Sequence, residues 1–164
     1  LIASDHAGFT LKEKLKNFLE KKGIGIKDLG TYSKERCDYP IFAYELAKDI
    51  SEGKSTRGIL ICKSGVGNSI VANRLPGVRA ALCHNITIAR LSRQHNDSNV
   101  LVLGSAFVKA DLAKRIISAW LNTKFLGGRH LRRLKLIDSI DGKTTPRAYK
   151  VLRGCARVGK ECVK

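Results

Sequence analysis

Residues Gly58 to Ser69 read GILICKSGVGNS, and this stretch decides the fold. A short apolar run ends at Cys62, and a loop rich in glycine and serine follows at once. The run predicts a buried strand, and the loop after it leads into a helix that we expect from Gly67. Backbone N–H groups at such a helix start bind anions. The stretch therefore predicts a parallel α/β fold with a ligand site at this turn.

The same alternation of short apolar runs and longer amphipathic stretches extends along the chain in both directions. The expected strands are Leu1–Ser4, Ile24–Leu29, Gly58–Ile61, Val78–Leu82 and Val100–Leu103. The expected helices are Phe9–Lys22, Ile41–Ser51, Gly67–Arg74, Ile86–Arg93, Ala110–Asn122 and Leu131–Ile140. This order predicts a three-layer α/β/α sandwich with a Rossmann-like, doubly wound parallel sheet of about five strands. Ligands collect at the carboxyl ends of such strands.

Charge is the unusual feature of the composition. The 164 residues include 31 lysines and arginines against 14 aspartates and glutamates, a formal net charge of +17. The length suits one domain, which we place at residues 1–141, and residues 142–164 are expected to be a basic C-terminal extension. A basic surplus fits either a solvated surface or affinity for polyanions. No aromatic residues alternate with the basic ones to stack bases, so a nucleic-acid partner is not expected.

Several other classes are disfavoured. No apolar run approaches the roughly 18–20 residues of a membrane span, so we expect a soluble cytoplasmic protein with no membrane partner. Five cysteines give an odd count without a C-x-x-C pair, which favours reduced thiols over disulfides. The cysteines and histidines also lack the spacing of zinc ligands, so neither a metal nor another cofactor is expected.

Cys62 has two interpretations. It could be a small buried residue at the end of a strand, or a reactive thiol at the mouth of the glycine-rich loop. The positive end of the following helix would favour the thiolate and lower the thiol pKa from about 8.5. A thiolate beside an anion hole can take a proton, or attack carbon, while negative charge builds on an oxygen.

Seven short motifs occur in one order along the first 140 residues. They are Asp5-His-Ala-Gly8, Asp38-Tyr-Pro40, Gly58-Ile-Leu-Ile-Cys62, Ser64-Gly-Val-Gly67, Arg79-Ala-Ala-Leu-Cys83, Arg93-Gln-His-Asn-Asp97 and Gly127-Gly-Arg-His130. This series closely resembles the type B ribose-5-phosphate isomerases, within the family that also includes galactose-6-phosphate isomerases. The resemblance implies a metal-independent aldose–ketose isomerase of the pentose phosphate pathway. Such an enzyme interconverts ribose 5-phosphate and ribulose 5-phosphate through an enediolate.

The resemblance also implies roles for individual residues. Cys62 would be the base that moves a proton between C1 and C2 of the open-chain sugar, assisted by Ser64. His95 would help to open the furanose ring, with Asp5 across the ring oxygen. The other implied contacts are the amides of Gly65, Val66, Gly67, Asn68 and Ser69 to the enediolate oxygen, Asp38, Tyr39 and Asn96 to sugar hydroxyls, and His6, Arg129 and Arg133 to the phosphate. The family builds this site at a dimer interface, which implies a homodimer, alone or within a tetramer.

Two alternatives stay open from the sequence. A hexose-6-phosphate isomerase, acting on allose or galactose phosphates, would carry the same motifs. A basic polyanion-binding module would use the charge but would have no need for Cys62 with His95. Three positions depart from the family's usual pattern: Lys63 stands in place of glycine, Asn68 in place of an apolar residue, and Ala106 in place of arginine. We expect Lys63 to point to solvent.

Overall fold

The computed structural model describes residues 1–140, which contain four strands and six helices. The strands are β1 (Ile2–Ser4), β2 (Gly58–Cys62), β3 (Ala80–Leu82) and β4 (Val100–Gly104). The helices are α1 (Phe9–Glu20), α2 (Tyr39–Ser51), α3 (Val66–Ala72), α4 (Ile86–Asn96), α5 (Ala110–Asn122) and α6 (Arg129–Asp138). The chain divides into two compact units, Leu1–Leu126 and a unit from Gly127 onward that contains α6.

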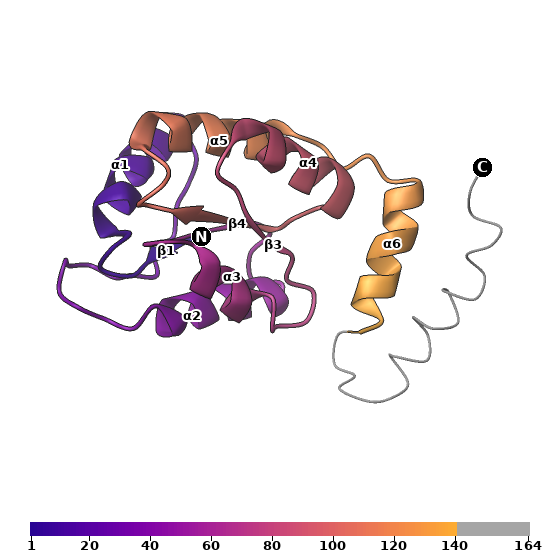
Figure 1. The fold of residues 1–164 in the computed structure, drawn as a ribbon, viewed down its shortest axis with the longest axis horizontal. Coiled ribbons are helices and arrows are strands. Elements are labelled where there is room, and N and C mark those ends of the chain that lie inside the picture. The colour runs from indigo at the N-terminus through magenta and orange to yellow at the C-terminus, as the bar shows by residue number, and fades with distance from the viewer. Residues whose placement is uncertain (141–164) are drawn as a thin grey trace. The chain divides into compact units, whose positions relative to one another are not determined.

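The sheet of the first unit is entirely parallel, with the strand order β1-β2-β4-β3. At the centre Gly58 pairs with Val100 at the amino end, and Cys62 pairs with Gly104 at the carboxyl end. Figure 1 shows α1, α4 and α5 on one face of the sheet and α2 and α3 on the other. The doubly wound, three-layer α/β/α fold that the sequence predicts is therefore confirmed.

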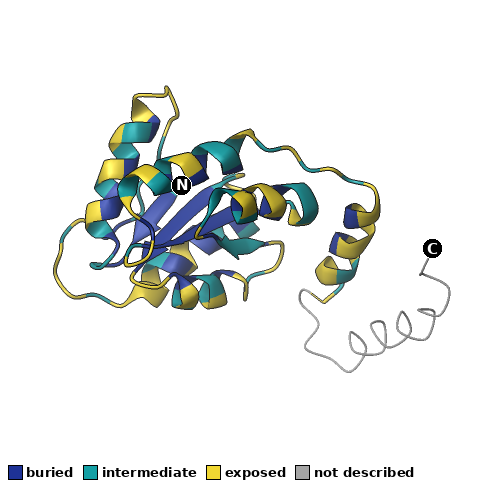
Figure 2. Cartoon of the chain, turned by 45° about the horizontal axis from the view of Figure 1, so that its top comes forward, coloured by how far each residue is buried: buried dark blue, intermediate teal, exposed yellow. Residues whose placement is uncertain are grey.

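Apolar clusters cover both faces of the sheet. On one face, Ile59 and Ile61 of β2 belong to a cluster with α1 and α5 that includes the fully buried Trp120. On the other face, Leu60 belongs to a cluster with α2 that includes Leu46. Figure 2 shows the buried strands between helices whose outer sides are exposed. Burial on both faces explains why the strands are continuous apolar runs in the sequence.

The expected strand Ile24–Leu29 does not form. Only Asp28 makes a bridge, to Ile2 of β1, and the Leu29 N–H donates to the Ile2 carbonyl at 2.9 Å. Gly30 has a φ of +100°, which lies outside the β region, although its carbonyl accepts the Ser4 N–H at 2.7 Å and the Thr31 N–H donates to the Ser4 carbonyl at 2.6 Å. The sheet of the described residues therefore has four strands instead of the expected five or so. The segment Ile24–Leu29 runs beside β1 as an irregular edge.

A buried lysine holds this irregular edge. Lys12 of α1 is fully buried, and its Nζ donates to both carboxylate oxygens of Asp28 at 2.6 and 2.7 Å. It also donates to the Thr31 carbonyl at 2.7 Å, and Lys16 pairs with Asp28 at 2.7 Å. Burial acts to raise the pKa of Asp28, but the hydrogen bonds from the two lysines outweigh it and lower that pKa. The segment is therefore fixed to α1 by charge as well as to β1 by backbone hydrogen bonds.

The helices begin and end within a few residues of the expected ranges. The difference that matters is α4, which continues through His95 and Asn96 instead of ending at Arg93. Its start is fixed by Asn85, whose Oδ1 accepts the Ile88 N–H at 2.8 Å. Two residues with predicted roles in the site therefore lie on the last turn of α4.

The second unit contains α6, on which Arg129 and Arg133 are exposed and four residues apart. That spacing places them on one face of the helix. The predicted extension 142–164 lies outside the described residues, and a single domain over 1–141 stays a prediction. No helix within residues 1–140 has the length and apolar character needed to cross a membrane.

Candidate active site

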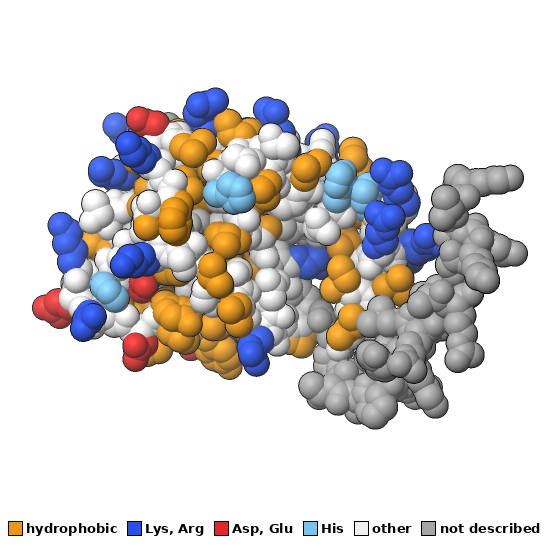
Figure 3. Space-filling model, viewed as in Figure 1, with side chains coloured by type: hydrophobic (Ala, Val, Ile, Leu, Met, Phe, Trp, Pro, Cys, Tyr) orange, Lys and Arg blue, Asp and Glu red, His pale blue; other side chains and the backbone are white. Residues whose placement is uncertain are grey.

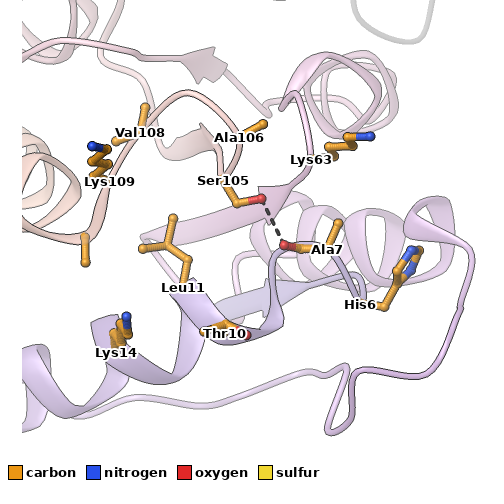
Figure 4. A pocket seen from close by; sticks show the side chains of 11 residues that line it. His6, Ala7, Thr10, Leu11, Lys14, Lys63, Ser105, Ala106, Val108 and Lys109 are labelled. Carbon is orange, nitrogen blue, oxygen red and sulfur yellow. Dashed lines mark hydrogen bonds between the residues drawn. The ribbon is translucent and has the colours of Figure 1, made fainter.

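Three loops meet at the carboxyl edge of the sheet, after β1, β2 and β4. The Asp5 N–H donates to the Ile61 carbonyl at 3.3 Å, and the Ser105 N–H donates to the Cys62 carbonyl at 2.9 Å. The Ser105 hydroxyl donates to the Ala7 carbonyl at 2.9 Å (Figure 4). These bonds cross-link the three loops, so the polar side chains that follow the strands are held together as the topology predicts.

Cys62 is the last residue of β2, and its side chain is almost fully buried. Burial raises the pKa of the Cys62 thiol, because a thiolate is poorly solvated there. The Gly65 N–H donates to Sγ at 3.2 Å, and the amides of Asn68 and Ser64 also favour the thiolate. The nearby Asp5 carboxylate acts in the opposite direction. The amides at the helix start lower this pKa, as expected, but they offset only part of the effect of burial, so the expected net lowering is wrong.

Two glycines let the loop close over the sulfur. Gly65 has a φ of +83°, and a Cβ there would collide with the side chain of Leu82. Gly67 lies beneath the ring of Tyr39, since a Cβ there would be 2.5 Å from the Tyr39 Cζ. The glycines of the motif thus allow a tight turn at Cys62 and bring Tyr39 onto the first turn of α3.

The amides of this turn are not equally available. Three of them already donate: Gly65 to the Cys62 Sγ at 3.2 Å, Val66 to the Ser64 Oγ at 3.3 Å, and Ser69 to the Gly65 carbonyl at 3.1 Å. The Asn68 N–H acts on the sulfur. Within residues 1–140, the Gly67 N–H makes no such bond. It is therefore the amide of this turn best placed to bind a ligand oxygen.

The side chains of Ser64 and Asn68 differ in exposure. Ser64 is exposed at the mouth of the loop, where its hydroxyl can reach a ligand. Asn68 is buried, and its Oδ1 has no hydrogen-bond partner in the part of the chain that the structure describes. Ser64 is therefore accessible at the loop, and its role in assisting the base stays a prediction.

Asp5 directly follows β1 and is buried, and its Oδ1 accepts the Gly8 N–H at 2.9 Å. Gly8 approaches β2 so closely that a Cβ would lie 2.5 Å from the Ile61 carbonyl oxygen. This close approach brings the Asp5 carboxylate near enough to Cys62 to raise the pKa of its thiol. The structure therefore places Asp5 and Cys62 in one site.

The segment before α2 forms another wall. The His6 Nδ1 accepts the Cys37 N–H at 3.2 Å, which leaves Nε2 for a ligand. Asp38 is the N-cap residue of α2 but makes no side-chain capping bond, and Tyr39 covers Gly67. His6, Asp38 and Tyr39 thus lie around the loops that hold Cys62.

A pocket of about 710 Å³ opens between these loops, α1 and the start of α5. Its basic side chains are Lys63, Lys14, Lys109 and the imidazole of His6, and among residues 1–140 no carboxylate lines it (Figure 4). Lys63 is exposed, as expected, but it faces this pocket. The sequence prediction missed Lys14 and Lys109. Lys109 comes shortly after β4, at the same sheet edge, and that position is the only signal that could have found it.

His95 and Asn96 are not brought to this edge within one chain. Helix α4 runs antiparallel to the strands, so its last turn lies at their amino ends. Just beyond it, the Asn99 N–H donates to the carbonyl of Arg79, which precedes β3, at 3.1 Å. The first and last residues of the five-residue strand β4 are about 13 Å apart. The contacts of Arg129 and Arg133 with a phosphate stay predictions, because α6 belongs to the second unit.

No three His, Cys, Asp or Glu side chains within residues 1–140 are grouped so as to hold a metal ion. Comparisons with known proteins agree with one another. The family model described as Ribose/Galactose Isomerase matches residues 1–137. Ribose-5-phosphate isomerase B from Escherichia coli is 47% identical over 137 residues, which cover 84% of this chain and 92% of that protein. D-erythrulose-4-phosphate isomerase from Pectobacterium atrosepticum is 41% identical over 128 residues, which cover 77% of this chain and 84% of that protein.

A solved structure shows the same fold. It is the crystal structure of ribose-5-phosphate isomerase B from Mycoplasma genitalium with bound ribulose-5-phosphate. Its TM-score to this chain is 0.83 at 41% sequence identity, and the match covers 87% of this chain and 95% of that one.

Proposed function

This chain belongs to the ribose/galactose isomerase family, and from that premise we propose that it interconverts ribose 5-phosphate and ribulose 5-phosphate. The relative from Escherichia coli and the ribulose-5-phosphate complex of the relative from Mycoplasma genitalium support this substrate. The observation that carries the proposal is the position of Cys62. Its thiol ends a central strand beside Asp5 and beneath the amides of a glycine turn.

The proposed chemistry is a proton transfer between neighbouring carbons. The Cys62 thiolate takes the proton from C2 of the open-chain aldose, and the electrons of that C–H bond form the C1–C2 double bond of an enediolate. The thiol then returns the proton to C1 while a carbonyl forms at C2. The Gly67 amide stabilises the oxygen on which charge builds, and the exposed Ser64 hydroxyl moves a proton between O1 and O2.

The remaining residues would bind and position the sugar. Asp38 and Tyr39, on the wall beside the glycine turn, would hold its hydroxyls. His6 would bind the phosphate through Nε2, with Arg129 and Arg133 of α6. Holding the phosphate away from the reacting carbons supplies binding energy that orients C1 and C2 over the base.

We propose that a second copy of the chain completes the site. His95 and Asn96 lie at the amino edge of their own sheet, so their contacts with the sugar require another chain. A surface suited to such a contact is available on α2 and α3, where the large exposed apolar side chains are Tyr39, Ile41, Tyr44, Val66 and Ile70. Figure 3 shows hydrophobic side chains gathered over these two helices. An apolar surface of this kind is typical of an interface between identical subunits.

A cytoplasmic location is part of the same proposal. Cys37, Cys62 and Cys83 are free thiols, as suits a protein that works in a reducing compartment.

Replacing Cys62 tests the mechanism. Cys62→Ala should lower kcat for ribose 5-phosphate at least about 100-fold in a coupled isomerase assay, because the variant lacks the thiolate that takes the proton from C2. Cys83→Ala is the matched control, since that thiol is buried in the core beside α4 and α5. Near-native turnover by Cys62→Ala would show that another residue is the base.

Substrate length is the open question within the family. The similarity to a D-erythrulose-4-phosphate isomerase favours a panel that begins with a four-carbon sugar. The panel should contain D-erythrulose 4-phosphate, ribose 5-phosphate, allose 6-phosphate and galactose 6-phosphate, each assayed with wild type and Cys62→Ala. The highest kcat/KM on a hexose phosphate would replace the pentose assignment. Salt-dependent binding of nucleic acid without any isomerase activity would instead favour a polyanion-binding module.

A further inference from the structure

The pocket between α1 and the start of α5 contains a cation that the proposed chemistry does not use. Lys63 directly follows Cys62, and its exposed side chain lines this pocket together with His6. Figure 4 shows Lys63 and His6 on one side of the pocket, and Lys14 and Lys109 on the other side, beyond Leu11. The cation adjacent to the proposed base is therefore Lys63.

Within the part of the chain that the structure describes, no side chain accounts for the position of Lys63. Among residues 1–140, no carboxylate forms an ion pair with it. Nor does it figure among the main influences on the pKa of Cys62, which are burial, three loop amides and Asp5. A lysine that faces a pocket without a carboxylate is available to an anionic ligand.

The side chains of Cys62 and Lys63 are adjacent in the chain but have different surroundings. Leu60 lies in the cluster with α2 and α3, and Ile61 lies in the cluster with α1 and α5. Cys62 ends β2 and accepts the Gly65 N–H at its Sγ, whereas Lys63 lies in the bend after the strand and its side chain lines the pocket beside α1 and α5. A ligand that lies across the carboxyl end of β2 meets the thiol on one side and the ammonium group on the other.

The backbone beneath this cation is held in place. The carbonyl of Lys63 accepts the Ala106 N–H at 3.1 Å, and the Ser105 hydroxyl holds Ala7, the neighbour of His6. Lys63 and His6 thus extend from loops that are already cross-linked. Binding an anion between them orders only their side chains, which lowers the entropic cost of binding.

We propose that Lys63 binds the phosphate of the sugar phosphate, together with His6. This inference rests on the proposed function and adds a specificity-determining residue to it. With C1 and C2 over Cys62, the sugar extends across the end of β2 and brings its phosphate to the Lys63 ammonium group. The contact selects phosphorylated over unphosphorylated sugars, and it positions the reacting carbons over the base.

Binding is measured by calorimetry on the full chain carrying Cys62→Ala, so that turnover does not interfere. Adding Lys63→Gln should raise the Kd for ribose 5-phosphate about tenfold or more, whereas Lys63→Arg should retain most of the affinity. Lys109→Gln removes one positive charge at the far side of the same pocket and should change the Kd by less than about twofold, because that charge is screened. Equal losses for Lys63→Gln and Lys109→Gln would overturn the proposal.

Steady-state kinetics with Cys62 intact separate this proposal from the function on which it rests. Lys63→Gln should raise the KM for ribose 5-phosphate and the inhibition constant of inorganic phosphate by similar factors, about tenfold, with a smaller effect on kcat. If the enzyme isomerises but neither constant changes, the role of Lys63 is wrong and the proposed function stands. If inorganic phosphate binds in a Lys63-dependent manner but no sugar phosphate isomerises, the anion site stands and the proposed function fails.

Discussion

Burial acts on Cys62 more strongly than the loop amides do, so the pKa of this thiol is raised and the protonated form dominates near neutral pH. Because the proposed base is the thiolate, kcat/KM should rise with pH through a group that titrates above the ordinary thiol value of about 8.5. Steady-state rates from about pH 6 to pH 10 measure this rise in kcat/KM. A profile without an alkaline rise would contradict the assignment of Cys62 as base.

Cys83→Ala provides the control for that profile. Burial raises the pKa of Cys83 to about 11, but this thiol packs in the apolar core, away from the proposed chemistry. The alkaline limb should therefore keep its position in the variant. If the alkaline rise disappeared in Cys83→Ala, the titrating group would be Cys83 and not Cys62.

Gly65 tests the turn that holds the sulfur. Gly65→Ala places a Cβ at a φ of +83° and against Leu82, so it should cost about 2–4 kcal/mol of unfolding free energy and at least about tenfold in kcat. Gly53 also has a positive φ, +72°, but a Cβ there meets open space. Gly53→Ala should therefore cost only about 1–2 kcal/mol and leave kcat unchanged. Urea unfolding and the coupled assay measure both variants. Equal losses for Gly65→Ala and Gly53→Ala would show that the turn around Cys62 does not depend on glycine at position 65.

At the scale of elements, Lys12 fastens the irregular edge after α1 to the sheet. Lys12→Met leaves the Asp28 carboxylate with Lys16 alone, and it should lower the unfolding free energy by about 3–5 kcal/mol. Lys16 is partly exposed, so Lys16→Met should cost no more than about 1 kcal/mol. Urea unfolding at neutral pH measures both variants. Similar losses for the two would contradict the buried role of Lys12.

Because the pKa of Asp28 is lowered in the folded protein, the difference in unfolding free energy between wild type and Lys12→Met should depend on pH. A carboxyl whose pKa is lower in the folded protein adds stability above its unfolded value of about 3.9. That contribution is lost as the pH falls through the folded value, because the carboxylate becomes protonated and its hydrogen bonds from Lys12 and Lys16 weaken. The unfolding free energies of wild type and Lys12→Met should therefore differ less in acid than at neutral pH.

Most elements were predictable because β1, β2 and β4 are buried, β3 is partly buried, and all four strands stand out as apolar runs. The segment Ile24–Leu29 has a similar composition, but its conformation depends on contacts that sequence periodicity does not report. The Asp28 carboxylate accepts a hydrogen bond from Lys12, and Gly30, two residues further on, has a positive φ. Local pattern therefore predicted a strand where long-range contacts produce an irregular edge.

The candidate site was predictable where its residues directly follow strands. Asp5 and Cys62 adjoin strand ends, so the topology alone places them together. The direction of the Cys62 pKa shift was not predictable, because it depends on how closely α3 and Asp5 cover the sulfur. Lys14 was missed because it lies on α1, and only the packed structure shows that it lines the pocket.

The whole molecule should contain sites shared between two chains. Cys62→Ala and His95→Ala homodimers should each lose at least about tenfold in activity, because each lacks one essential group. In a mixed dimer, one site combines the intact Cys62 of one chain with the intact His95 of the other. After subunit exchange at equal concentrations, the mixture should recover about a quarter of wild-type activity, since half of the dimers are mixed and each has one intact site.

Subunit exchange is verified separately, by native mass spectrometry on chains of different isotopic mass. A mixture that contains mixed dimers but remains inactive would contradict a shared site. Ile70→Asp, in the exposed apolar surface on α3, should shift the protein towards monomers and lower its activity in parallel.

The burial of Cys62 also bears on the durability of the protein. Peroxides and alkylating reagents react with accessible thiolates, and further oxidation of the resulting sulfenic acid is irreversible. Cys62 exposes 4% of its surface, and its raised pKa keeps most of the sulfur protonated near neutral pH. The same packing that keeps most of Cys62 in the thiol form therefore shields its sulfur from oxidants. The protein should retain activity at peroxide concentrations that inactivate enzymes with exposed thiolates.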